Sequence, residues 1–241
     1  MGVKQRRQDI AGIRRRDIMK AAWELMESKG VLNVTMDEIA RKSEYTKQTV
    51  YSYFSSKDEL LVAIYLERFQ ERWGSHQGQM DAMPTGIDKL WAFSRSYYSY
   101  FAGHPTDLHL LIYIDFRGLY FADIYKKLYA EHKEYYDRTE KYMQAVLKQA
   151  QQEGTVRGGL DLWWTLSYIY LSLRANLNEI MMKNGLSAAK REELYFTFVD
   201  ILIQGMSPAI DKSAIQKGGS LLKKVKQDTL SRDKMQSGSR G

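Results

Sequence analysis

The chain has 241 residues and a net charge of +7, and 44% of its residues are hydrophobic, which suits a small domain followed by a larger one. It contains no cysteine, which excludes disulfides, thiolate metal sites and cysteine nucleophiles. Residues 1–16 are too polar for a secretory signal, and no apolar run approaches membrane-spanning length. We therefore expect a cytoplasmic protein without a membrane partner.

The basic excess lies at the two ends of the chain. Residues 1–16 carry six lysine and arginine side chains against Asp9 alone, and residues 207–241 carry eight against three acidic ones. Such clusters suit the phosphate backbone of nucleic acid, although charge alone favours a solvated, disordered segment. We expect a basic N-terminal arm over 1–13 and a basic, disordered tail over 211–241.

The first structural signal is a pair of helices separated by a short break. Apolar residues at helical spacing predict a helix over 14–29, and Gly30 suits the left-handed position that follows a helix. Thr35 and Glu38 then form a capping box, Thr-x-x-Glu, which predicts the start of a second helix.

A short third helix and a long fourth helix follow. Thr46 is a good N-cap for the third helix, whose inward residues should be Val50 and Phe54. Ser56 and Glu59 form a second capping box at the start of an amphipathic helix. This order of elements is typical of a helix-turn-helix DNA reader.

A specific set of residues is spread over positions 12–66. It comprises Ala21-Ala22, Gly30, VTMDEIA at 34–40, TVYSYF at 49–54 and SKDELL at 56–61. As a set it resembles the DNA-binding domain of the tetracycline-repressor (TetR) family of regulators. The family usually has Ala-Gly-Val-Ser through the turn, where this chain has Ser-Glu-Tyr-Thr. Since glycine accepts a positive φ without penalty, Glu44 should be strained or adopt another turn geometry.

The third helix offers side chains that suit DNA. The N-terminal end of a recognition helix enters the major groove, where glutamine pairs with adenine, lysine with guanine and the threonine methyl group with thymine. The base-reading candidates are Lys47, Gln48, Thr49 and Ser52. The phosphate candidates are Thr35, Thr46, Tyr51, Tyr53 and Lys57. Both tyrosines could instead be core aromatics, and for Tyr51 the resemblance favours DNA.

Only helical patterns follow, which predicts an all-α protein with a three-helix DNA-binding domain over 14–60 and a helical domain over 61–210. We expect a loop over 74–86, one long helix over 120–152, and two last helices over 162–183 and 188–206. The resemblance implies a homodimer through these last two helices. Candidates for the seam are Trp163, Leu166, Tyr170, Leu173, Leu177, Phe196, Val199 and Ile203, which would look the same in an intrachain core.

The second domain is rich in aromatic residues with scattered polar partners, as ligand pockets are. The resemblance implies a small-molecule site there, although each single residue is as easily plain core. The pocket candidates are Trp91, Tyr98, His109, Tyr113, Phe116, Arg117, Tyr120, Trp164, Tyr168, Arg174 and Asn178. Arg117 or Arg174 would neutralise an anionic ligand, or would pair with Asp115 or Glu179.

No motif for catalysis, metal binding or cofactor binding is present. The sequence has no Glu-x-x-His, P-loop, dinucleotide fingerprint or Gly-x-Ser-x-Gly elbow, so we expect no enzyme, metal or cofactor. The expected function is a homodimeric repressor that binds a pseudo-palindromic double-stranded DNA operator and is released by a small molecule. The alternatives are a ligand-independent nucleoid protein, an activator, and a protein that has lost DNA binding.

Overall fold

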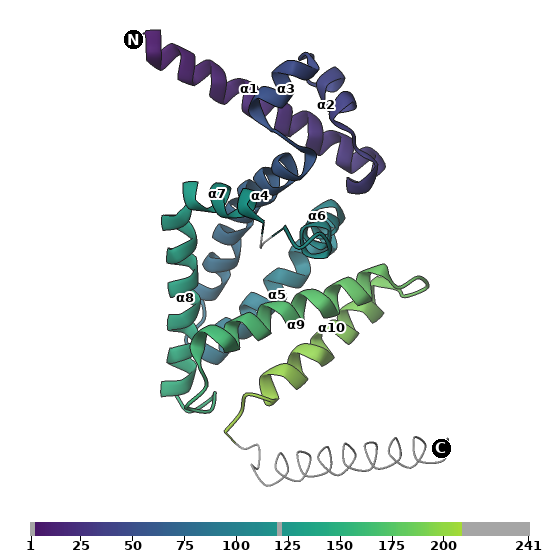
Figure 1. Cartoon of the computed structure of the whole chain (residues 1–241). Helices are drawn as coiled ribbons and strands as arrows, with labels where there is room; N and C mark the ends of the chain where they lie inside the picture. Colours follow the sequence, from purple (N-terminus) through teal and green to yellow (C-terminus); the bar gives the residue numbers. More distant parts are fainter. Residues whose placement is uncertain (1–2, 120–121, 209–241) are drawn as a thin grey trace, which may run out of the picture.

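The computed structural model describes residues 3–119 and 122–208 (Figure 1). These residues form ten α-helices and one 3-10 turn, with no strand, as the sequence predicts. The tail expected over 211–241 lies outside the described residues. The elements in chain order are α1 (Val3–Lys29), η1 (Val31–Asn33), α2 (Met36–Lys42), α3 (Lys47–Tyr53), α4 (Lys57–Asp81), α5 (Gly86–Gly103), α6 (Pro105–Phe116), α7 (Asp123–Glu131), α8 (Lys133–Gln152), α9 (Leu162–Met182) and α10 (Ala188–Gln204).

Helices α1 to α3 form a small domain at one end of the molecule, and α4 leads from it into the body (Figure 1). Its core includes Ile18, Met26, Ile39, Val50 and Phe54, all nearly inaccessible to solvent. The two residues expected to anchor the third helix are therefore buried as predicted.

The capping residues predicted from the sequence begin their helices as expected, with one difference in the second capping box. The Thr35 side chain accepts from the Glu38 amide, and the Glu38 carboxylate accepts from the Thr35 amide, which completes the first capping box. The Ser56 hydroxyl caps α4 by accepting from the Glu59 amide. The Glu59 carboxylate, however, accepts from the backbone and hydroxyl of Ser55, so the second box closes one residue earlier than expected.

Two predicted boundaries near the ends of helices are wrong. The basic segment over 1–13 was expected to be an arm, but α1 begins at Val3 and continues through it. The predicted loop over 74–86 is also mostly helix, because α4 continues through Gly74 and Gly78 to Asp81. Tertiary packing of Trp73, His76 and Met80, which are buried on this last part of α4, offsets the glycine penalty.

The body is a helical bundle in which α5 packs between α4 and α8, and α9 lies beside α10 (Figure 1). The single helix predicted over 120–152 is instead two, α7 and α8, which meet at His132. No helix in the described part of the chain is long and apolar enough to cross a membrane.

The last two helices bury half of the residues that we expected at a dimer seam. Leu166, Leu173, Leu177 and Val199 belong to the core of their own chain. Trp163 of the predicted seam is exposed on α9, together with other apolar residues of α9 and α10: Trp164, Tyr168, Leu171, Met182, Leu194 and Ile201. Trp163 is the one residue of the predicted seam that is strongly exposed. Helical periodicity marks an apolar stripe, but it does not tell whether the same chain or a second copy covers that stripe.

Candidate nucleic-acid interface and ligand cavity

The outward face of α3 presents the predicted base-reading side chains together. Lys47, Gln48 and Ser52 are exposed, and Thr49 is half-buried. Val50 holds the opposite face of the helix in the core. The helix starts at a firm cap, because the Thr46 hydroxyl accepts from the Thr49 amide at 3.1 Å. A short, rigid helix is therefore offered to a partner by its polar face.

Three of these side chains already have partners within the chain, and one of them is Thr49, whose hydroxyl shares a hydrogen bond with the Thr46 hydroxyl at 2.9 Å. The Lys47 ammonium pairs with Asp37 of α2 at 2.6 Å on the exposed surface. The Ser52 hydroxyl donates to the Thr49 carbonyl oxygen at 2.6 Å. Since exposed ion pairs contribute only about 0–1 kcal/mol, Lys47 can exchange Asp37 for DNA at small cost. The exposed Gln48 side chain has no ion pair or hydrogen bond among the described residues, so it is the most available of the four for contact with a partner.

The predicted phosphate contacts differ in how free they are. Thr46 and Tyr51 are exposed, whereas Tyr53 is half-buried against the core. The Lys57 ammonium donates to the Leu32 carbonyl oxygen at 3.0 Å, and burial lowers the pKa of Lys57.

Thr35 is exposed but serves as the cap of α2, and its partner Glu38 is held charged. The Lys29 ammonium first, and hydrogen bonds from Thr35 next, lower the pKa of Glu38 to about 2. The cap therefore keeps its acceptor at any physiological pH.

The turn between α2 and α3 contains the strained residue that the sequence suggests. Glu44 has a φ of 59° and is the one non-glycine residue with a positive φ among those described. The Glu44 amide donates to the Arg41 carbonyl and the Tyr45 amide to the Ala40 carbonyl, which is a Schellman ending of α2. The Tyr45 hydroxyl then donates to Asp17 of α1 at 2.9 Å, which fixes the turn.

Replacement of Glu44 by glycine should stabilise the protein by up to about 1 kcal/mol, because glycine adopts a positive φ without the Cβ penalty but loses more backbone entropy. The measurement is the thermal midpoint, which should rise by a few degrees. Glu44→Ala removes the same charge and keeps the Cβ. An equal gain in both variants would assign the effect to charge.

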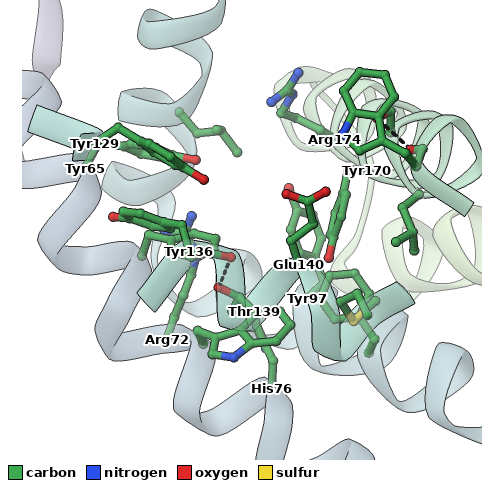
Figure 2. Close-up of a pocket in the computed structure, with 18 of the residues that line it drawn as sticks. Tyr65, Arg72, His76, Tyr97, Tyr129, Tyr136, Thr139, Glu140, Tyr170 and Arg174 are labelled. Atoms are coloured by element: carbon green, nitrogen blue, oxygen red, sulfur yellow. Dashed lines mark hydrogen bonds between the residues drawn. The ribbon is translucent and has the colours of Figure 1, made fainter. Parts of the chain in front are cut away.

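A cavity of about 580 Å³ lies in the body and is lined by residues of the six helices α4 to α9 (Figure 2). Ten of its nineteen lining residues are aromatic, and the charged ones are Arg72, Glu140 and Arg174. Its size and apolar lining match those of small-molecule sites. Because α4 also follows directly on the DNA-binding domain, the cavity and the polar face of α3 are connected by one helix.

The structure places the predicted pocket residues mostly elsewhere. Arg174 lines this cavity, and Tyr120 lies outside the described residues. Tyr98 packs on Tyr195, and Phe116, Trp164 and Tyr168 are exposed. None of the other candidates lines the cavity: Trp91, His109, Tyr113, Arg117 and Asn178. The prediction counted aromatic residues without knowing which face of each helix turns inward.

Two functional candidates were missed by the sequence analysis, Arg72 and His76. They lie one turn apart on α4 and both face the cavity. The signal was present as two polar residues at positions i and i+4 beside the apolar residues Trp73 and Met80, but the loop predicted over 74–86 assigned His76 to a non-helical segment.

A chain of polar contacts joins the body to the start of α4. Asp58 accepts from the Tyr113 hydroxyl at 2.7 Å and from Arg117 at 3.1 Å. Burial first, and the hydrogen bond to Asp58 next, raise the pKa of Tyr113 to about 12. On the same helix α6, Asp115 pairs with the cavity residue Arg174 at 2.6 Å, which is the ion pair that the sequence offered as an alternative. Burial nevertheless raises the pKa of Asp115 to about 6.

These features define a helix-turn-helix DNA-binding domain on a helical body with an internal cavity. Residues 18–64 match the model of a family described as bacterial regulatory proteins, tetR family. The N-terminal domain of the chain is therefore similar to the DNA-binding domain of this family, and relatives that match the chain are described as HTH-type transcriptional regulators or repressors.

Two curated relatives resemble parts of the chain. Over 78 residues, or 32% of the chain, it is 36% identical to the HTH-type transcriptional regulator SrpR of Pseudomonas putida. Over 139 residues, or 58% of the chain, it is 25% identical to the HTH-type transcriptional repressor SCO4008 of Streptomyces coelicolor. The matched segments span 34% of SrpR and 65% of SCO4008.

The whole fold is shared with solved structures. The TetR-family transcriptional repressor FadR of Thermus thermophilus, in complex with lauroyl-CoA, superposes with a TM-score of 0.60 at 16% sequence identity. The match covers 82% of this chain and 99% of that chain. The likeness therefore extends through the helical body as well as the DNA-binding domain.

Proposed function

We propose that the protein is a ligand-responsive repressor that binds a pseudo-palindromic operator as a homodimer and is released by a small molecule. The observation that carries this proposal is the course of α4. It begins at Lys57, three residues after the buried anchor Phe54, and lines the cavity with Arg72 and His76 before it ends at Asp81. A ligand that changes the position of α4 would also move the recognition helix.

Release by a ligand follows from geometry and linkage. Two recognition helices must lie one turn of DNA apart, about 34 Å, to enter successive major grooves. A ligand that shifts their separation must bind the DNA-free form more tightly than the DNA-bound form. The T. thermophilus FadR structure contains lauroyl-CoA, so acyl-CoA esters belong among the first compounds to test.

The homodimer is supported by the exposed apolar residues of α9 and α10. Trp164 and Tyr168 are 56% and 61% exposed, and Leu171 and Ile201 are also exposed. Trp164 stacks on Tyr168 with ring centroids 6.1 Å apart. Large apolar groups gathered on neighbouring helices mark an association surface, and a second copy offers the same surface about a two-fold axis.

Replacement of Gln48 by alanine should relax base preference at one position of each half-site by about 1–3 kcal/mol, because a bidentate contact is lost. The measurement is affinity for a set of operator variants at fixed salt. Gln79→Ala, on an exposed part of α4, is the matched control. Unchanged discrimination in the Gln48 variant would remove this residue from base reading.

Footprinting on the DNA upstream of the protein's own gene separates the alternatives. One short palindromic footprint that a compound releases supports the repressor. Many sites that are insensitive to every compound support an architectural protein, and the absence of any footprint supports lost DNA binding. An activator would give a footprint with transcription that falls when the gene is deleted.

A further inference from the structure

Arg72 is a buried cation without an acidic partner in the described residues. Its residue is 6% exposed, and no carboxylate of residues 3–119 or 122–208 forms an ion pair with it. Its guanidinium lies instead among the rings of Tyr65, Phe69, Tyr100 and Phe101, 5.1–5.8 Å from their centroids. Contact with ring faces offsets part of the desolvation free energy of a buried guanidinium, whereas a carboxylate or phosphate would offset much more of it.

His76, one turn further along α4, carries a second unsatisfied group. Its Nδ1 atom lies 2.5 Å from the Ser96 hydroxyl, and its Nε2 atom is buried without a hydrogen-bond partner. Burial first, and the charge of Arg72 next, lower the pKa of His76 to about 4, so the ring is neutral at pH 7.

The hydrogen bond to Ser96 indicates which nitrogen carries the proton. Nδ1 is the one acceptor found for the Ser96 hydroxyl among the described residues. A buried hydroxyl that donates to Nδ1 leaves the proton of the neutral ring on Nε2. The unsatisfied Nε2–H of His76 is therefore a donor, like the guanidinium of Arg72.

The other charges of the cavity do not satisfy these donors. Glu140 is exposed to solvent and accepts from the Gln144 amide at 2.9 Å. Arg174 already pairs with Asp115 at 2.6 Å. Figure 2 shows Arg72 and His76 at one side of the cavity, with Arg174 and Tyr170 across from them. The uncompensated charge that the cavity holds in a buried position is therefore positive.

The remaining lining suits an apolar body. Phe69, Trp73, Phe93 and Tyr97 form a continuous series of ring contacts along α4 and α5. Tyr170 of α9 meets the edge of Phe93 with centroids 5.5 Å apart. Rings in this arrangement favour planar or extended apolar groups over strongly hydrated ones.

We infer that the cavity binds an organic anion whose carboxylate or phosphate group is held by Arg72 and the Nε2–H of His76, and whose apolar body packs on the aromatic rings. This inference rests on the proposed function, in which the cavity is the effector site. Because both anion-binding side chains belong to α4, the ligand acts on the helix that leads to α3.

Three naphthalene probes of equal shape test the sign of the charge: 2-naphthoate, 2-naphthamide and a 2-naphthyl trimethylammonium ion. Calorimetry on the full chain should show the acid binding at least about tenfold more tightly than the amide or the cation. Laurate and lauroyl-CoA then distinguish a carboxylate from the phosphates of a coenzyme A ester. Equal binding of the amide or the cation, or no binding by any anion, overturns the inference.

Variants locate the anion. Arg72→Gln should weaken acid binding about tenfold or more and leave the amide unchanged, whereas Arg72→Lys should keep part of the preference. Arg138→Gln is the matched control, since Arg138 is exposed on α8 and also lies over a tyrosine ring. His76→Leu replaces an unsatisfied group by an apolar one and should fold even if Arg72→Gln does not. Full acid affinity in both cavity variants would contradict the site.

A gel-shift arm separates this inference from the proposed function. An acid that binds through Arg72 but does not release the operator would overturn release by a ligand and leave the anion site intact. Release by the cation or the amide alone would support the repressor and overturn the anion site.

Discussion

Replacement of Asp107 by alanine is expected to lower the free energy of unfolding by up to about 3–5 kcal/mol, because it leaves a partly buried guanidinium without its bidentate partner. Both carboxylate oxygens of Asp107 accept from Arg68, each at 2.6 Å, and the Asp107 side chain is 1% exposed. Arg68 also lies over the Trp23 ring at 3.7 Å. One ion pair therefore connects α1, α4 and α6.

The measurement is denaturant unfolding at fixed protein concentration, because the stability of the proposed homodimer would depend on concentration. Asp137→Ala is the matched control, since Asp137 pairs with Lys133 one turn away on the surface of α8. The control should change stability by no more than about 0.5 kcal/mol. Similar losses in both variants would show that the Arg68–Asp107 pair is not a structural node.

Replacement of Gly86 by alanine should also be strongly destabilising, by about 2–3 kcal/mol or more. A Cβ on Gly86 would lie 2.3 Å from the Ala150 backbone nitrogen, so α5 and α8 would have to separate. The Gly86 amide also donates to the Glu153 carboxylate at 2.8 Å, which holds the first turn of α5 in place. Separation of these helices would widen the cavity, because both contribute to its lining.

Unfolding midpoints of Gly86→Ala and Gly74→Ala provide the comparison. A Cβ on Gly74, in the C-terminal third of α4, would meet nothing within 4 Å. Gly74→Ala should therefore gain up to about 1 kcal/mol of helix propensity. If both variants behaved alike, the close approach of α5 and α8 would not be rigid.

The DNA-binding domain was predictable because its signals are local. Thr35, Thr46 and Ser56 cap the helices that the sequence assigns to them, and Val50 and Phe54 are buried. Capping depends on residues three positions apart, so no tertiary information is needed. The strained conformation of Glu44 in the turn was also predictable. A residue with a Cβ is strained at a positive φ, and Glu44 occupies the position where the family usually has glycine.

Longer-range features were not predictable in the same way. Two glycines in α4 read as a loop, but buried contacts made by Trp73 and Met80 keep the helix intact. The break between α7 and α8 has no proline or glycine to mark it. It occurs at His132, close to Tyr136, whose hydroxyl donates to the Leu66 carbonyl of α4. Contacts between distant segments decide both cases.

The residues that line the cavity were not predictable for a related reason. Tyr168 and Tyr170 are two residues apart on α9, so they point to nearly opposite faces of the helix. Tyr168 is exposed, whereas Tyr170 lines the cavity together with Arg174 one turn later. Composition predicted an aromatic pocket, but the inward face of each helix is set by packing against its neighbours.

Because α1 is continuous from Val3, the basic N-terminal segment is part of a rigid helix and not of a flexible arm. Its 27 residues correspond to about 40 Å of helix, and Arg6 and Arg14 are exposed along it. A helix is too wide for the minor groove, which is about 6 Å across. The positive charges of Arg6 and Arg14 are therefore held at fixed positions along the helix axis. They should contribute to the salt dependence of DNA binding rather than to the choice of sequence.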